Sequence, residues 1–77
     1  MDIKEFVMKE VANAFGVEKD TLTLETSLLE DLKGKSVNYF PLMNALEEEY
    51  DLELDYQPFR SQCITIGDIV NMVEEEA

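Results

Sequence analysis

Ser36 lies close to the start of a predicted helix, where a serine hydroxyl would be exposed. The chain has no His and no Gly-rich phosphate loop, and Cys63 is its single thiol. The usual pairs of nucleophile and base, and the usual transition-metal sites, therefore cannot be assembled. No segment alternates acidic ligands around a central Gly with a terminal Glu, as a calcium-binding loop would. By itself, Ser36 is more simply interpreted as an ordinary helix cap.

The charge balance limits the partners of the chain. Eighteen acidic residues against six basic ones give a formal net charge of −12 over 77 residues. Such a protein repels phosphate backbones and anionic membranes and favours partners with basic surfaces. We therefore expect no nucleic acid partner.

Length and composition predict one folded domain over residues 1–77, and we expect a monomer. Hydrophobic residues make up 45% of the chain, but so short a chain buries only about 60–65% of its unfolded surface, which disfavours a deep catalytic cleft and an enzyme. A lone Cys63 forms no internal disulfide and fits a reducing compartment, with the cytoplasm as the default. The sequence contains neither an apolar run of about 18 residues nor a signal-peptide pattern, so we expect no membrane insertion.

Capping signals and apolar periodicity predict the first and last helices. Asp2 and Glu5 resemble a capping box ahead of an apolar stripe, and Gly16 supplies the left-handed residue that ends many helices, so the first helix should stop near Phe15. Thr65 with Asp68 forms a second such box, and the last helix should run to about Glu75.

The segments between these helices are less regular. Residues 17–35 are expected to form a long loop pinned by leucines, with a short helical turn over 27–31 that Ser27 caps and Glu30 answers. The pattern over 42–50 predicts the second main helix. Pro41 lacks an N–H and would conflict with the carbonyl of Val37, so this helix should begin near Asn38 or Tyr39, with Ser36 on an irregular segment before it. Phe40, which precedes the proline, also favours a distorted start.

The remaining segment and the overall pattern complete the fold prediction. Residues 55–60 should form at most a short turn, because Pro58 suits only the first turn of a helix. Strand-like alternation is absent. The sequence therefore predicts an all-α fold, a small helical bundle of three main helices plus a short helical turn, with a long loop between helices one and two.

Two stretches around Ser36 carry a family resemblance. The segment Glu30-Asp31-Leu32-Lys33-Gly34-Lys35-Ser36-Val37, followed by Leu42 and by Ala45-Leu46-Glu47-Glu48-Glu49-Tyr50, resembles the acyl carrier protein family. In that family, an acidic residue followed by Asp and Leu precedes an Asp-Ser-Leu motif. A helix follows that ends in Ala-Leu-Glu-Glu-Glu and an aromatic residue. The likeness covers most of the chain, and Ser36 falls on the modified serine.

The resemblance implies a carrier rather than an enzyme. Ser36 would receive 4′-phosphopantetheine from coenzyme A, and the thiol of this arm would hold an acyl chain as a thioester. The dipole and unpaired N–H groups of a helix N-terminus tolerate the attached phosphate. The implied partners are a phosphopantetheinyl transferase and acyl-processing enzymes with basic docking surfaces. The implied pathways are fatty acid biosynthesis or other lipid metabolism, or a polyketide-type route.

Departures from the family pattern predict a specialised member. Lys35 replaces the usual Asp, Val37 replaces the usual Leu, and Lys33 adds a second cation beside Ser36. Like charges across an interface oppose binding, so standard basic partners should bind less well. Two acidic family positions are Asn38 and Pro41 here. The residues expected to contact partners are Lys33, Lys35, Val37, Phe40, Glu47 and Glu48.

Several alternatives remain open. Glu47 to Glu49 could form a solvated helix face instead of a docking surface. Met43, Leu46 and Tyr50 should pack in the core, and could also line the space that an acyl chain enters. The chain could instead be an unmodified, carrier-like binding module, or, less simply, an acidic decoy for a nucleic-acid-binding protein.

Overall fold

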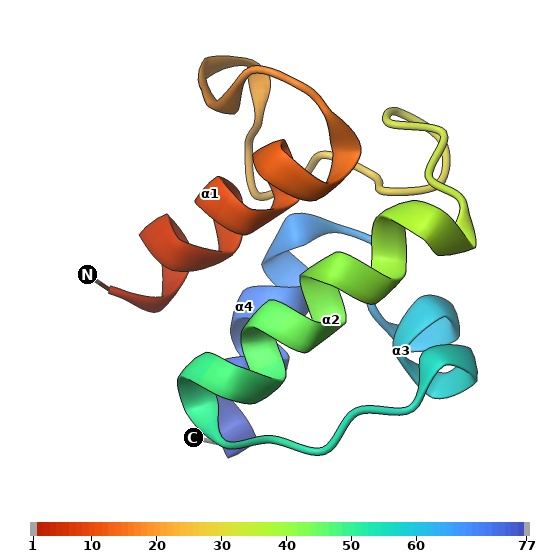
Figure 1. The fold of residues 1–77 in the computed structure, drawn as a ribbon. Helices are drawn as coiled ribbons and strands as arrows, with labels where there is room; N and C mark the ends of the chain where they lie inside the picture. Colours follow the sequence, from red (N-terminus) through yellow and green to blue (C-terminus); the bar gives the residue numbers. More distant parts are fainter. Residues whose placement is uncertain (1, 77) are drawn as a thin grey trace.

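The helices pack around one core (Figure 1). The computed structural model describes residues 2–76. Within them lie α1 (Ile3–Phe15), a short 3-10 helix η1 (Lys19–Thr21), α2 (Ser36–Tyr50), α3 (Tyr56–Gln62) and α4 (Ile66–Glu76). Helix α1 packs against both α2 and α4, and α3 packs against α2. The described residues form no strand, which confirms the prediction of an all-α bundle.

Helices α1 and α4 begin where their capping residues predicted, and α1 also ends where Gly16 predicted. The Asp2 carboxylate accepts a hydrogen bond from the Glu5 N–H at 2.8 Å, and Gly16 ends α1 with φ 68°. At α4, the Asp68 N–H donates to the Thr65 hydroxyl at 3.2 Å and the Asp68 carboxylate accepts from the Thr65 N–H at 3.0 Å. Helix α4 ends at Glu76, one residue beyond the prediction.

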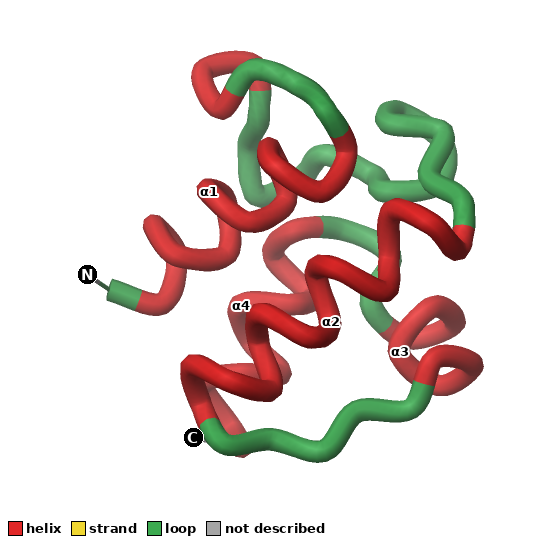
Figure 2. The backbone as a smooth tube through the Cα atoms, in the orientation of Figure 1, coloured by secondary structure: helices red, strands yellow, loops and turns green. Residues whose placement is uncertain are grey.

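A long loop over 17–35 connects α1 to α2, as predicted (Figure 2). Leu22 and Leu28 anchor it in the core at 5% and 0% exposure, whereas Leu24 is 40% exposed. The Ser27 hydroxyl accepts a hydrogen bond from the Glu30 N–H at 3.0 Å, as predicted. The reciprocal bond comes from Asp31 and not from Glu30: the Asp31 carboxylate accepts from the Ser27 N–H at 2.8 Å. The segment is a capped turn. The short helix η1 in the same loop was not predicted.

The predicted late start of the second helix is wrong. Helix α2 begins at Ser36 and contains Pro41. The physical reason lies in the first turn: the Lys35 carbonyl accepts from the Asn38 and Tyr39 N–H groups, and the Asn38 side chain ties this turn to the Ala14 carbonyl of α1. Phe40, expected to distort the start, lies within this helix.

The segment before the last helix is also more regular than predicted. It forms the seven-residue α3 rather than at most a short turn over 55–60. Pro58 occupies the first turn, as its missing N–H requires. The burial of Phe59 and Cys63, 4% and 3% exposed, stabilises the rest of the helix.

The core is continuous through α1, α2, α3, α4 and the long loop. Met43 and Leu46 belong to it, and Tyr50 packs at its edge, as predicted. The Tyr50 ring meets the Phe6 ring edge-on at 5.5 Å between centroids. Over residues 2–76 every helix is too short or too polar to cross a bilayer.

Candidate functional site

Ser36 is the first residue of α2, half-buried and preceded by Lys35 as the capping residue. The first backbone bonds of the helix run from the Asn38 and Tyr39 N–H groups to the Lys35 carbonyl, at 2.8 and 3.2 Å. Within residues 2–76, the N–H groups of Ser36 and Val37 and the Ser36 hydroxyl form no hydrogen bond. A nucleophilic oxygen therefore lies beside two free donors at a positive helix end, an arrangement that suits an attached phosphate group.

The side chain of Asn38 fixes this helix start in place. Its Oδ1 accepts from the Lys35 N–H at 2.9 Å, and its Nδ2 donates to the Ala14 carbonyl at 3.0 Å. The first bond closes the first turn of α2, and the second ties that turn to the end of α1. The sequence indicated only that Asn38 lacks the acidic charge usual at this position.

Gly34 determines how closely the chain approaches α1 before Ser36. Its N–H donates to the Leu28 carbonyl at 2.8 Å. A Cβ at this position would overlap the Phe15 ring and come within 3.0 Å of the Leu28 carbonyl oxygen. A side chain here would require the Phe15 ring and the Leu28 backbone to move, so the glycine lets the segment before Ser36 pack against the end of α1.

The predicted partner residues near Ser36 lie on the surface. Lys33 and Lys35 are exposed, and neither forms an ion pair with any other residue in 2–76. Val37 and Phe40 are 73% and 49% exposed. The structure thus brings two free cations and two exposed apolar side chains to the start of α2, on a protein whose net charge is −12.

The two predicted partner glutamates at the other end of α2 differ in environment. Glu48 is exposed, but Glu47 is half-buried and its Oε2 accepts from the Leu54 N–H at 2.9 Å. Glu47 therefore holds the loop after α2 in addition to any role in docking. No local pattern in the sequence indicates a contact across seven residues and a loop.

An aromatic cluster lies between α2 and α3 and was missed by the sequence analysis. The Tyr39 ring meets the rings of Phe15, Tyr56 and Phe59 edge-on, with centroids 5.5, 6.0 and 6.2 Å apart. The Arg60 guanidinium lies 5.9 Å from the centroids of both the Tyr39 and Tyr56 rings. The sequence offered one signal for this cluster: Tyr56 and Phe59 lie in the segment predicted to be a turn, Tyr39 lies at the predicted helix start, and none of the three had been given a role.

The Tyr39 hydroxyl is buried without a hydrogen-bond partner among the described residues. Burial raises the pKa of this hydroxyl, against the opposing effect of Arg60. Because an unsatisfied buried hydroxyl is unfavourable, we predict that Tyr39→Phe leaves the free energy of unfolding unchanged or raises it by about 1 kcal/mol. Urea denaturation of both proteins measures the change. A loss of about 2 kcal/mol or more would reveal a hydrogen bond to this hydroxyl in solution.

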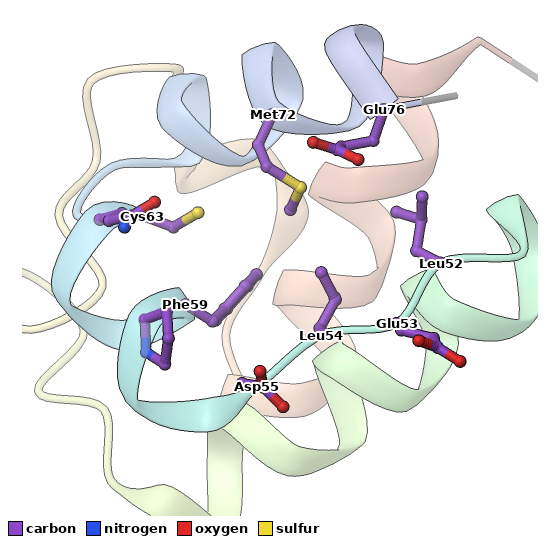
Figure 3. A pocket seen from close by; sticks show the side chains of 10 residues that line it. Leu52, Glu53, Leu54, Asp55, Phe59, Cys63, Met72 and Glu76 are labelled. Atoms are coloured by element: carbon purple, nitrogen blue, oxygen red, sulfur yellow. The ribbon is translucent and has the colours of Figure 1, made fainter.

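A surface groove of about 230 Å³ lies between the loop after α2, α3 and α4 (Figure 3). Its apolar lining includes Leu52, Leu54, Phe59 and Met72, and three carboxylates, Glu53, Asp55 and Glu76, line it too. Met43, Leu46 and Tyr50, considered above as possible contacts of an acyl chain, do not line it.

The Cys63 thiol, which borders this groove, is unreactive at neutral pH. Burial, with a smaller effect of the Asp68 charge, raises the pKa of the Cys63 thiol to about 11. The thiol is therefore protonated at neutral pH and a poor nucleophile. Residues 2–76 also contain no grouping of three or more His, Cys, Asp or Glu side chains suited to a metal ion.

The comparison with individual known proteins identifies one family. No family model matches the chain. It is similar to the acyl carrier proteins of Lactococcus lactis subsp. cremoris (strain MG1363) and Lactococcus lactis subsp. lactis (strain IL1403), at 35% identity over 74 residues, which cover 96% of this chain and 96% of each relative. Given this identity over nearly the whole length, the chain belongs to the acyl carrier protein family.

Proposed function

We propose that this protein holds acyl intermediates as thioesters on a 4′-phosphopantetheine arm attached to the Ser36 hydroxyl. The observation that carries the proposal is the position of that hydroxyl at the start of α2, beside two free N–H groups. These donors and the helix dipole stabilise the negative charge of a phosphodiester. As a member of its family, the protein is a carrier and not an enzyme. The arm's thiol, rather than a side chain of the protein, bears the acyl group.

The partners that fit this role are a phosphopantetheinyl transferase and the enzymes that process the bound acyl chain. Exposed Glu48 suits a basic surface on such an enzyme, whereas Lys33 and Lys35 beside Ser36 oppose one. The exposed Val37 and Phe40 offer apolar contacts between these charges. This division supports a specialised carrier with a dedicated set of partners, in fatty acid, lipid or polyketide-type metabolism.

Intact-mass measurement tests the attachment. Wild-type protein incubated with coenzyme A and a broad-specificity transferase should gain one phosphopantetheine group, and Ser36→Ala should gain none. Ser61→Ala is the matched control, because Ser61 is an exposed serine on α3, and it should be modified like wild type. A wild-type protein that stays unmodified would favour the alternative function, an unmodified binding module.

We further predict that Lys35 selects between transferases. Lys35→Asp should be modified about threefold to tenfold faster than wild type by a standard transferase with a basic docking surface at low salt, because charge at an interface acts mainly on association rate. The difference should shrink as salt screens the charges. A dedicated partner should show the opposite preference.

The control for this experiment is Lys35→Asn. Lys35 caps α2, and Asp and Asn are both good caps, so both variants should keep or slightly raise the melting temperature while only one introduces a negative charge. Equal modification rates for wild type and Lys35→Asp across the salt range would exclude electrostatic selection at this position.

A further inference from the structure

The interior between α2 and α3, next to Ser36, is filled by aromatic rings. Tyr39 lies one helical turn after Ser36 and is 0% exposed, and Phe59 from α3 is 4% exposed. Their rings meet edge-on, 6.2 Å between centroids, and Phe15 from α1 closes the other side of Tyr39 at 5.5 Å. Edge-to-face packing of this kind is close and directional, so no apolar chain can enter here unless a ring leaves.

A second layer covers these rings from the solvent side. The Phe40 ring lies on the Tyr56 ring with centroids 4.9 Å apart and planes inclined by 35°. Arg60 donates from Nη1 to the Tyr56 hydroxyl at 2.7 Å. The charged guanidinium also lies 5.9 Å from the Tyr39 ring centroid. This surface layer joins α2 to α3 beside Tyr39.

The groove of about 230 Å³ does not provide a site for an acyl chain between α2 and α3. None of its lining residues belongs to α2. It opens beside the loop that follows Tyr50 and along α3, its lining reaches the aromatic cluster only at Phe59, and three carboxylates line it.

We propose that this carrier holds its acyl group outside the bundle, and that its cargo is a short or polar acyl group rather than a long alkyl chain. The inference rests on the proposed attachment of the arm to Ser36. An apolar chain is driven out of water in proportion to its area, so a long chain requires a cover. The aromatic packing between α2 and α3 leaves no space beside Ser36 in which a long alkyl chain could be shielded from water. A short or polar acyl group needs no such shielding.

Hydroxylamine cleavage of the bound thioester tests the proposal. Protein is loaded with acetyl, octanoyl or dodecanoyl arms from the matching coenzyme A thioesters, and intact mass establishes loading before any rate is measured. A thioester drawn into the bundle reacts only in proportion to its exposed fraction, so the three rates should agree within about twofold in wild type. Cleavage of the dodecanoyl form about tenfold or more slower than the acetyl form would overturn the proposal.

Opening the aromatic cluster provides the converse experiment. In Phe59→Ala the dodecanoyl thioester should become protected about tenfold relative to acetyl, because the freed volume can admit the chain. Val11→Ala is the matched control, a buried truncation on α1 that should leave all rates equal. If Phe59→Ala does not fold, Tyr39→Leu opens the same contact with a smaller loss of volume. Equal rates in a folded opening variant would show that aromatic packing does not control access.

A measurement without the transferase separates this proposal from the attachment to Ser36. In a Ser36→Cys, Cys63→Ala protein, the thiol at position 36 is alkylated with N-ethylmaleimide or N-dodecylmaleimide. The melting temperatures of the two adducts should agree within about 2 °C, whereas a buried chain would raise the melting temperature of the dodecyl adduct by about 4–8 °C or more. Failure of coenzyme A loading would therefore contradict the proposed function alone, and a raised melting temperature would contradict the external cargo alone.

Discussion

Leu46→Ala should lower the free energy of unfolding by about 2–5 kcal/mol, the range for a leucine removed from a packed core. Leu46 is 0% exposed and lies on the face of α2 that meets the rest of the bundle. The loss combines the transfer energy of the missing carbons with the cavity that they leave. Against a total stability of about 5–10 kcal/mol for a domain of this size, it removes a large share.

Urea denaturation measures this change, and an unchanged slope with denaturant concentration would show that the unfolding transition is the same in both proteins. Glu48→Ala is the control, because Glu48 is exposed on the same helix and should change stability by no more than about 0.5 kcal/mol. A loss below about 0.5 kcal/mol for Leu46→Ala would mean that this leucine is not part of the core.

Asn38→Ala should cost about 1–3 kcal/mol, because it removes two hydrogen bonds worth roughly 0.5–1.5 kcal/mol each. One bond holds the Lys35 N–H and the other reaches the Ala14 carbonyl. Their loss should also loosen the first turn of α2. Urea denaturation measures the stability, and amide hydrogen exchange of the residues in that turn measures the local effect.

Two variants make this result interpretable. Asn38→Asp keeps an acceptor for the Lys35 N–H and adds negative charge at a helix start, but loses the donor to Ala14, so its cost should be smaller than that of Asn38→Ala. Asn44→Ala removes an exposed Asn from the same helix and should be neutral or stabilising. Equal stabilities of the Asn38→Ala and Asn44→Ala proteins would contradict the anchoring role of Asn38.

These results bear on how the protein would act as a carrier. Gly34 and Asn38 fix the segment around Ser36 against the end of α1, so the proposed arm would leave from a defined point. Exposed Lys35 and Val37 flank that point and can act on partners without changing the core. Stability and selectivity thus depend on different residues of the same helix start.

Local signals in the sequence determined where α1 begins and ends and where α4 begins. The Asp2 cap, the box of Thr65 with Asp68 and the glycine at position 16 act within three or four residues, so their effects are visible without the fold. The family motif likewise identified Ser36 as the candidate for modification. The all-α class followed from the helical spacing of apolar residues.

Only the tertiary structure decided where α2 begins and how long α3 is. It also decided that Glu47 binds the loop after α2 while Glu48 stays exposed. A proline weakens a helix locally, but the bond from Asn38 to Ala14 favours a continuous helix from Ser36. Burial of Phe59 likewise stabilises α3 as a helix, although local signals predicted only a turn in that segment. In each case partners far apart in the sequence supply the free energy, and a local pattern contains no information about them.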